Sequence, residues 1–192
     1  MKAIQTHALN CKFRSRTEAR WGVFFETLGL KWEYEPEGFD LGDGVWYLPD
    51  FRVLYPNRGE PVWEWFEVKS DLSLITPAEW QKLVLFSRNH RITVLDGKPA
   101  ETVYLPADAI LRGGIEYDDP IVGFVPSRKA LAACQDPGRQ GAVLWSHKGR
   151  LWNDYAAEVF QEDSTIDDEC VALIRKAIRA ANSADFKHGA VA

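Results

Sequence analysis

Residues Val45 to Lys69, VWYLPDFRVLYPNRGEPVWEWFEVK, predict the centre of the fold. Aromatic and β-branched residues dominate VWYLPDFRVLY (45–55) and WEWFEVKS (63–70), a composition that is typical of β-strands. The turn between them, PNRGEP, is short, so the two strands are expected to pair antiparallel as a hairpin. Pro49 cannot donate to a sheet ladder and therefore predicts an irregularity or a sheet edge at that point of the first strand.

A helix is expected before this hairpin and a helix and a strand after it. Ser15 can cap a helix that runs to about Leu28, because apolar residues recur there at helical spacing. A short extended piece, LKWEYEP, links this helix to the hairpin. Thr76 followed by Pro77 and Glu79 predicts a second helix start with a capping box, and RITVLD then predicts a buried strand.

This order of elements predicts an α/β fold with a mixed sheet flanked by helices. We assign residues 1–105 to this core and residues 106–192 to a C-terminal α+β extension. In the extension, IVGFV and AVLWS are expected to be short strands, and Asp167 to Asn182 to be an amphipathic helix with Val171, Ile174 and Ile178 on one side. Substrate choice or dimerisation would be the role of the extension.

Composition and charge restrict the class of protein. With 192 residues, eight Trp and ten Phe, the chain is long and apolar enough for a globular core, which excludes a disordered protein. Three widely spaced cysteines argue against a disulfide framework and favour a cytoplasmic setting. No signal peptide or membrane span is expected. The net charge of −5 argues against a non-specific nucleic-acid coat, although Lys12, Arg14, Arg16 and Arg20 form a basic cluster.

The two predicted strands carry the side chains that could bind a metal or take part in catalysis. Side chains alternate along a strand, so Glu67 and Lys69 share a face that Val68 does not, and Asp50 lies on the adjacent strand. Two carboxylates about 4 Å apart repel by roughly 4 kcal/mol at a protein surface, and a divalent cation would compensate them. Oxygen ligands without His or Cys select Mg²⁺ or Mn²⁺, which suits phosphodiester cleavage with Lys69 near the attacking water.

Leu48-Pro49-Asp50-Phe51 followed by Trp65-Phe66-Glu67-Val68-Lys69 resembles the signature of the PD-(D/E)xK nuclease superfamily. The segment Arg14 to Trp21, with Tyr34-Glu35-Pro36-Glu37 after it, resembles small phage and prophage members whose first helix adds an acidic ligand, here Glu18. The resemblance covers about the first hundred residues and implies a restriction-endonuclease-like core. It also implies that the metal, Mg²⁺ with Mn²⁺ as a substitute, is held by Asp50, Glu67 and the carbonyl of Val68.

The sequence therefore predicts a metal-dependent DNA endonuclease of phage, prophage or mobile-element type, acting alone, as a homodimer or with a partner protein. One alternative is a structure-selective nuclease for junctions or transposon ends. Another is a non-catalytic module that keeps the nuclease fold to bind nucleic acid or protein. The predicted catalytic residues are Glu18, Asp50, Glu67 and Lys69.

Each of these residues also has a structural interpretation. Glu18 would form a capping box with Ser15 instead of binding metal, and Glu67 with Lys69 would be a surface ion pair worth at most ~1 kcal/mol. Within the basic cluster, Arg14, Arg16 and Arg20 would either be solvated or line the route of the phosphate backbone of a nucleic acid. A further polar active-site group is also considered at Gln81 or Lys82, where a surface position is favoured, and one exposed Trp ring would stack on an unpaired base.

Overall fold

The computed structural model describes residues 6–55, 62–100, 103–112, 122–123, 142–147, 150–155 and 168–186. The first half of the chain forms the following elements: β1 (Thr6–Ala8), β2 (Cys11–Phe13), α1 (Arg16–Thr27), β3 (Lys31–Tyr34), β4 (Phe39–Asp40), β5 (Trp46–Tyr47), β6 (Phe51–Tyr55), β7 (Val62–Lys69), η1 (Leu72–Leu74), α2 (Pro77–Ser87) and β8 (Ile92–Asp96). The second half adds β9 (Val103–Pro106), α3 (Ala107–Arg112), β10 (Val122–Gly123), β11 (Ala142–His147), β12 (Arg150–Tyr155) and α6 (Asp168–Ser183).

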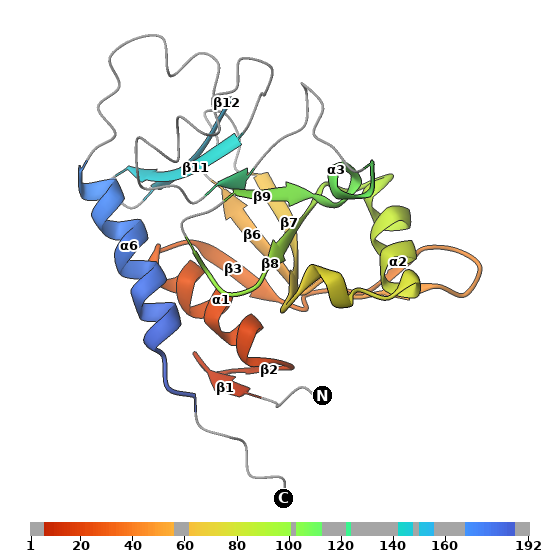
Figure 1. The fold of residues 1–192 in the computed structure, drawn as a ribbon, viewed down its shortest axis with the longest axis horizontal. Helices are drawn as coiled ribbons and strands as arrows, with labels where there is room; N and C mark the ends of the chain where they lie inside the picture. Colours follow the sequence, from red (N-terminus) through yellow and green to blue (C-terminus); the bar gives the residue numbers. More distant parts are fainter. Residues whose placement is uncertain are drawn as a thin grey trace, which may run out of the picture.

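An eight-stranded sheet organises the described residues, in the order β12-β11-β10-β9-β8-β7-β6-β3 (Figure 1). Strands β6 and β7 pair antiparallel, as the hairpin prediction requires, whereas β7 and β8 are parallel and are joined through α2. The sheet also contains a parallel contact between β10 and β11. The predicted α/β class with a mixed sheet is confirmed.

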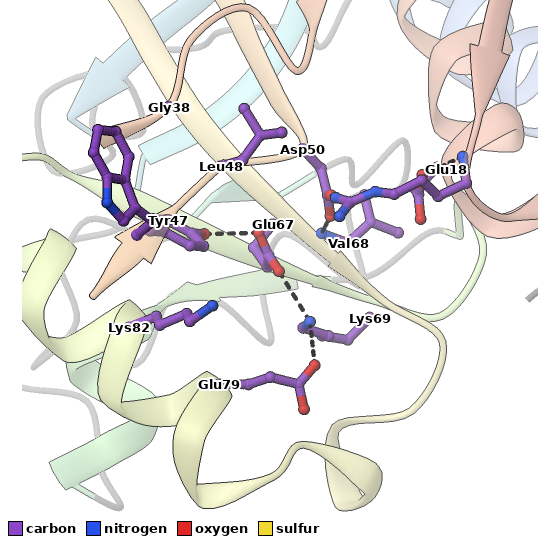
Figure 2. A pocket seen from close by; sticks show the side chains of 12 residues that line it. Glu18, Gly38, Tyr47, Leu48, Asp50, Glu67, Val68, Lys69, Glu79 and Lys82 are labelled. Carbon is purple, nitrogen blue, oxygen red and sulfur yellow. Dashed lines mark hydrogen bonds and ion pairs between the residues drawn. The ribbon is translucent and has the colours of Figure 1, made fainter. Parts of the chain in front are cut away.

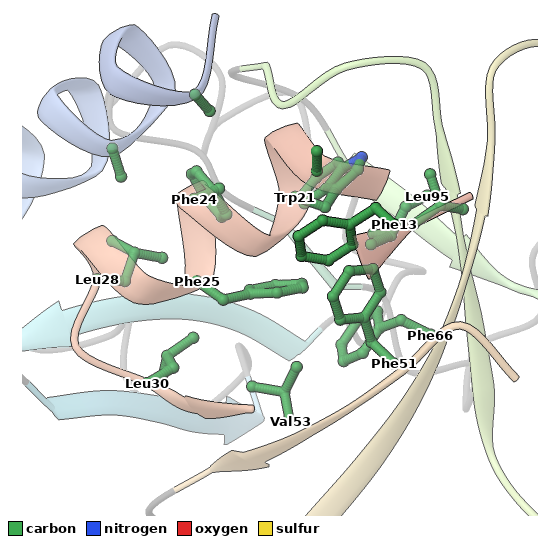
Figure 3. Close-up of a cluster of buried hydrophobic side chains, with 14 of the residues drawn as sticks. Phe13, Trp21, Phe24, Phe25, Leu28, Leu30, Phe51, Val53, Phe66 and Leu95 are labelled. Carbon is green, nitrogen blue, oxygen red and sulfur yellow. The ribbon is translucent and has the colours of Figure 1, made fainter. Parts of the chain in front are cut away.

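Helix α1 begins and ends where the sequence predicts. The Oγ of Ser15 accepts a hydrogen bond from the backbone N–H of Glu18, and Gly29 follows the helix with a φ of +71°, a conformation that glycine adopts without strain. The buried face of α1 carries Trp21, Phe24 and Phe25, all fully inaccessible (Figure 3). Burying each such aromatic ring stabilises the fold by roughly 1.5–3 kcal/mol, so α1 is a main anchor of the core.

Side-chain alternation along β7 divides the molecule into two apolar layers. Phe66 and Val68 lie in the larger cluster with α1 (Figure 3). Trp65 lies in a second cluster on the other side, against Leu83 and Phe86 of α2. Glu67 has the parity of Trp65 and faces the layer of α2. The sheet therefore has α1 on one face and α2 on the other.

Helix α6 belongs to the same core as α1. Ile174, Ala177 and Ala181 are buried in the larger cluster, and Figure 1 shows α6 alongside α1. The expected helix and its apolar side are confirmed at Ile174, whereas the Val171 side chain lies outside the described residues. The hydrophobic core thus extends beyond residue 105, because α6 covers α1 and β9 to β12 prolong the sheet.

The prediction of one strand over residues 45–55 is wrong. Trp46–Tyr47 form β5, which pairs with β4 in a separate small sheet, and β6 begins only at Phe51. Pro49 lies in the break, where the irregularity was expected, because a proline cannot continue the ladder. The expected strand AVLWS is confirmed as β11, and IVGFV is described only at Val122–Gly123. Among the described helices, none has the length and apolarity to cross a bilayer.

Candidate active site

A pocket of about 700 Å³ opens at the point where β6 begins and β7 ends. Residues from α1, the β5–β6 connection, β7 and α2 converge on it (Figure 2). Its lining consists of Arg14, Glu18, Gly38, Trp46, Tyr47, Leu48, Asp50, Glu67, Val68, Lys69, Glu79 and Lys82. All four predicted catalytic residues are therefore brought together, although Glu18 lies 49 residues before Glu67 in the chain (67 minus 18).

Asp50 occupies the end of the β6–β7 ladder. Pairing of these two strands stops at Phe51 and Phe66, so the next N–H of β7 that faces β6 has no strand partner there. The Oδ2 of Asp50 accepts a hydrogen bond from the Val68 N–H at 2.7 Å, and its Oδ1 lies 2.5 Å from Nη2 of Arg14. Asp50 is only 2% exposed. The break at Pro49 thus leaves the buried Asp50 carboxylate in the lining of the pocket.

Glu67 is also buried and is held from two sides. Its Oε2 accepts a hydrogen bond from the Tyr47 hydroxyl at 2.7 Å, and its Oε1 lies 2.9 Å from the Lys69 Nζ (Figure 2). Burial, followed by the charge of Glu67, raises the pKa of Tyr47 well above its ordinary value, so the phenol remains a donor. The exposed surface ion pair that was the alternative for Glu67 is wrong, because Glu67 is 6% exposed.

Lys69 connects Glu67 of β7 to Glu79 in the first turn of α2. Its Nζ lies 2.9 Å from Glu79 Oε1 as well as 2.9 Å from Glu67 Oε1. The Oε2 of Glu79 accepts from the Thr76 backbone and hydroxyl in the predicted capping box. The capping glutamate of α2 therefore also fixes the position of the lysine.

Glu18 lies on the buried side of α1 and is 7% exposed. Its Oε2 accepts hydrogen bonds from the Tyr34 hydroxyl at 2.5 Å and from the Arg14 N–H at 3.0 Å. The N-cap of α1 comes from Ser15 and the backbone N–H of Glu18. The capping-box role for the Glu18 carboxylate is therefore wrong in the structure, and the buried acid is available to the pocket.

Replacing Glu18 with glutamine tests whether its charge serves a metal. An amide oxygen still accepts from Tyr34 and from the Arg14 N–H, so we expect Glu18→Gln to melt within ~3 °C of the parent. Loss of the charge should weaken Mn²⁺ binding at least ~10-fold in a calorimetric titration. Glu26→Gln, on the same helix but outside the pocket, is the matched control. Parental Mn²⁺ affinity in Glu18→Gln would remove Glu18 from the site.

Of the three predicted nucleic-acid-binding arginines, one lines the pocket and two do not. Arg14 lines the pocket, but its Nε and Nη2 contact Glu35 and Asp50, so it serves the acids in this arrangement. Neither Arg16 nor Arg20 lines it. Arg16 is exposed, and the guanidinium of Arg20 lies 6.0 Å from the Phe186 ring centroid.

The predicted surface position is confirmed for one residue of the α2 pair. Gln81 is exposed and lies outside the pocket, as expected. Lys82 lines the pocket, and Figure 2 shows its side chain extending from α2 toward the side of the pocket that holds Glu67 and Lys69. Lys82 therefore adds a cation opposite the buried carboxylates.

Sequence reasoning missed the residues that hold the acids in place. Tyr34, Glu35, Tyr47 and Glu79 contact the predicted site residues directly. Tyr34 and Glu35 lie in the segment that carried the family resemblance, and Glu79 was recognised only as a cap. The sequence offers no local signal for Tyr47, because its contact with Glu67 joins two different sheets.

The donor set fits a hard divalent cation. Burial, and then the charges of Glu67 and Glu18, raise the pKa of Asp50 well above its ordinary value, although the Val68 N–H and the charge of Arg14 act in the opposite direction. Within the ranges that the structure describes, no three His, Cys, Asp or Glu side chains are already gathered as a metal site. The oxygens of Asp50 and Glu67 instead face Arg14 and Lys69. Arg14 and Lys69 therefore supply the positive charge that lies beside these two carboxylates in this structure.

Comparison of the chain with protein-family models, with curated proteins and with solved structures found no match. The pocket geometry is therefore the observation that a functional proposal has to explain.

Proposed function

We propose that the chain is a Mg²⁺-dependent endonuclease that hydrolyses phosphodiester bonds in DNA. One observation carries the proposal. The acids of the sequence motif, Asp50 and Glu67, are both buried in one pocket with Lys69 beside them and with Glu18 contributed by a separate helix. Buried carboxylates that repel one another destabilise a fold unless a cation joins them, so such a cluster indicates a function.

The chain's own residues have distinct tasks in this proposal. Glu18, Asp50, Glu67 and the Val68 carbonyl would hold Mg²⁺, which when bound would polarise the scissile phosphate and acidify water. Tyr47 keeps Glu67 in one orientation through its hydroxyl. Such supporting contacts fix the direction in which a ligand oxygen points.

Lys69 is the group that would act on the reacting oxygens. It lies against Glu67 but is a cation, so it cannot be a metal ligand. A cation in this position stabilises negative charge as it develops on the phosphate and orients the attacking water. Arg14 would retain contact with Glu35 when Asp50 turns to a metal, because its Nε and Nη2 contact different acids.

One observation favours a second candidate, the non-catalytic module. Arg14 already places positive charge 2.5 Å from Asp50, and a guanidinium that permanently replaced the metal would leave a binding fold without turnover. Metal titration separates the two candidates, since a non-catalytic module of this kind would bind no divalent ion at Asp50.

The deciding experiment is cleavage of a panel of labelled single-stranded, duplex, branched and RNA substrates with Mg²⁺ or Mn²⁺. We expect cleavage of at least one DNA substrate, abolished by chelator and by the double variant Asp50→Asn/Glu67→Gln. The matched control is Glu64→Gln, which changes a largely buried acid of the same strand outside the pocket and should leave cleavage intact. A protein that binds neither Mg²⁺ nor Mn²⁺ and cuts no substrate would overturn the proposal.

A further inference from the structure

Two apolar side chains stand exposed at the edge of the pocket. Trp46 is 62% exposed and Leu48 is 37% exposed, and both line the cavity that holds the acids. The other large apolar side chains recorded as exposed in the described ranges, Leu9, Leu74 and Leu111, do not line it. An indole carries the largest apolar surface of any side chain, so leaving it in water next to a polar pocket points to a ligand that covers it.

The backbone of Trp46 is firmly held despite the exposure of its side chain. Strand β5 pairs with β4, with Trp46 opposite Asp40. The next residue, Tyr47, is buried, lies 5.0 Å from Phe86 between ring centroids and donates its hydroxyl hydrogen to Glu67. Trp46 is therefore fixed one residue away from a direct support of the proposed metal ligand. An indole has only two side-chain torsions, so it loses little conformational entropy when a flat ligand stacks on it.

Cations line the same cavity and complement a phosphate. Lys82 and Lys69 reach it from α2 and β7, on the side of the sheet to which Glu67 points (Figure 2). A nucleotide offers a flat apolar face and a phosphate within one unit, which matches an indole beside lysines. In a continuous duplex both faces of each base are covered by neighbouring bases, so only an unpaired or terminal base has a free face to stack on Trp46.

We infer that Trp46, with Leu48 beside it, is a stacking platform for an unpaired nucleotide, so that the site acts on single strands or on single-stranded arms of branched nucleic acid. This inference rests on the proposed function and narrows its substrate class. Stacking on an aromatic ring is insensitive to base identity, so little sequence specificity is expected from this contact. Stacking on Trp46 does not distinguish a deoxyribonucleotide from a ribonucleotide, so the oligothymidylate and oligouridylate arms of the test separate the two.

The test measures affinity without cleavage, by fluorescence anisotropy in Ca²⁺, of the full chain for an oligothymidylate, an oligouridylate and a duplex of equal length whose terminal base pairs are covered by covalent end caps. We expect Trp46→Ala to weaken single-strand binding about 5- to 150-fold, which corresponds to ~1–3 kcal/mol for one stacked base, and to change duplex binding less than ~2-fold. Trp46→Phe should stay within ~5-fold of the parent. The control Leu74→Ala removes a 71% exposed apolar side chain outside the pocket and should change neither.

Other results would overturn the platform. These are a parent protein that binds no single strand, equal losses on single strand and duplex in Trp46→Ala, or parental affinity in that variant. Cleavage assays keep this question separate from the nuclease proposal. Duplex cleavage at the parental rate by Trp46→Ala, with no Trp46-dependent strand binding, removes the platform and leaves the nuclease. Trp46-dependent binding of oligothymidylate without cleavage of any substrate supports the platform and removes the nuclease.

Discussion

Lys69→Ala is expected to reduce single-turnover cleavage at least ~100-fold while it leaves metal binding and nucleic-acid binding close to the parent. The reason is the charge state and place of the amine. Burial alone lowers the pKa of Lys69, but the charges and hydrogen bonds of Glu67 and Glu79 raise it to about 12. Lys69 is therefore expected to be protonated at neutral pH, which argues against a general-base role.

A protonated lysine beside Glu67 can contribute only through its charge and its three N–H donors. Removing a donor aimed at a developing oxyanion typically costs ~3 kcal/mol of barrier, about a hundredfold in rate. The effect should appear in the rate and not in the affinity, because the contact strengthens as charge develops. A purely structural ion pair would instead change stability by under ~1 kcal/mol and leave turnover alone.

Two further variants make the Lys69 experiment decisive. Lys69→Met keeps most of the side-chain volume without the charge and should lose as much rate as Lys69→Ala. Lys69→Arg keeps the charge and should retain part of the rate, although its donors are arranged differently. Parental single-turnover rates in folded Lys69→Met would contradict the catalytic assignment.

The secondary structure of the first hundred residues was predictable because its signals are local. Ser15 and the Thr76 capping box each define a helix start through contacts within four residues. The alternation of apolar and polar residues in β7 is a property of that segment alone. The division between β5 and β6 was not predictable in detail. It depends on β4, a two-residue partner strand that arises from a turn-rich segment without strand periodicity.

The sequence predicts the helices and strands of the core better than it predicts which of them pack against each other. The amphipathic pattern of α6 predicts a buried face but does not name what it packs against, and the structure places it on α1, more than 140 residues earlier in the chain (168 minus 27 is 141). The sequence therefore predicts a separate extension for residues 106–192, whereas Ile174 and Ala177 lie in the same core cluster as Phe24. Helical periodicity identifies a face, and only the tertiary fold identifies its partner.

The site was predictable where its residues carry a motif and not where they support it. Glu67 and Lys69 follow from side-chain alternation along one strand, whereas Asp50 follows from the Pro-Asp motif in the neighbouring segment. The role of Tyr47 could not be predicted, because an aromatic residue in a strand usually packs in the core. Only the fold places its hydroxyl next to Glu67. The sequence predicts one role for Glu79, capping of α2, and in the structure the same carboxylate also forms an ion pair with Lys69.

Asp50→Asn is expected to stabilise the metal-free protein at neutral pH and to abolish its stabilisation by Mn²⁺. The pKa of Asp50 is raised well above its ordinary value, first by burial and then by Glu67 and Glu18, so the folded state holds this proton more tightly than the unfolded state. A raised carboxyl pKa means that stability falls as the pH rises from the ordinary value of about 4 through the raised one. Asparagine does not ionise and escapes this loss.

The contacts of Asp50 set the size of the expected change. An asparagine Oδ1 can still accept from the Val68 N–H, whereas the ion pair with Arg14, whose side chain is 53% exposed, is lost. Relief of the repulsion from Glu67 should outweigh that pair, giving a gain of ~1–2 kcal/mol and a melting temperature higher by ~2–8 °C without metal. Mn²⁺ at a hundred times its dissociation constant should stabilise the parent by about 2.7 kcal/mol and the variant by much less.

The order of stability of parent and Asp50→Asn should therefore reverse when Mn²⁺ is added, which thermal melts from pH 4 to pH 9 with and without the ion would record. Glu64→Gln separates burial from metal binding. Burial also raises the pKa of Glu64, which lies on β7 outside the pocket, so this control should flatten the pH dependence while its response to Mn²⁺ stays parental. An Asp50→Asn protein that is less stable at every pH and still gains the parental increment from Mn²⁺ would make Asp50 a structural partner of Arg14. The metal would then have to bind elsewhere, because a ligand that has lost its charge cannot leave the affinity for a hard divalent ion unchanged.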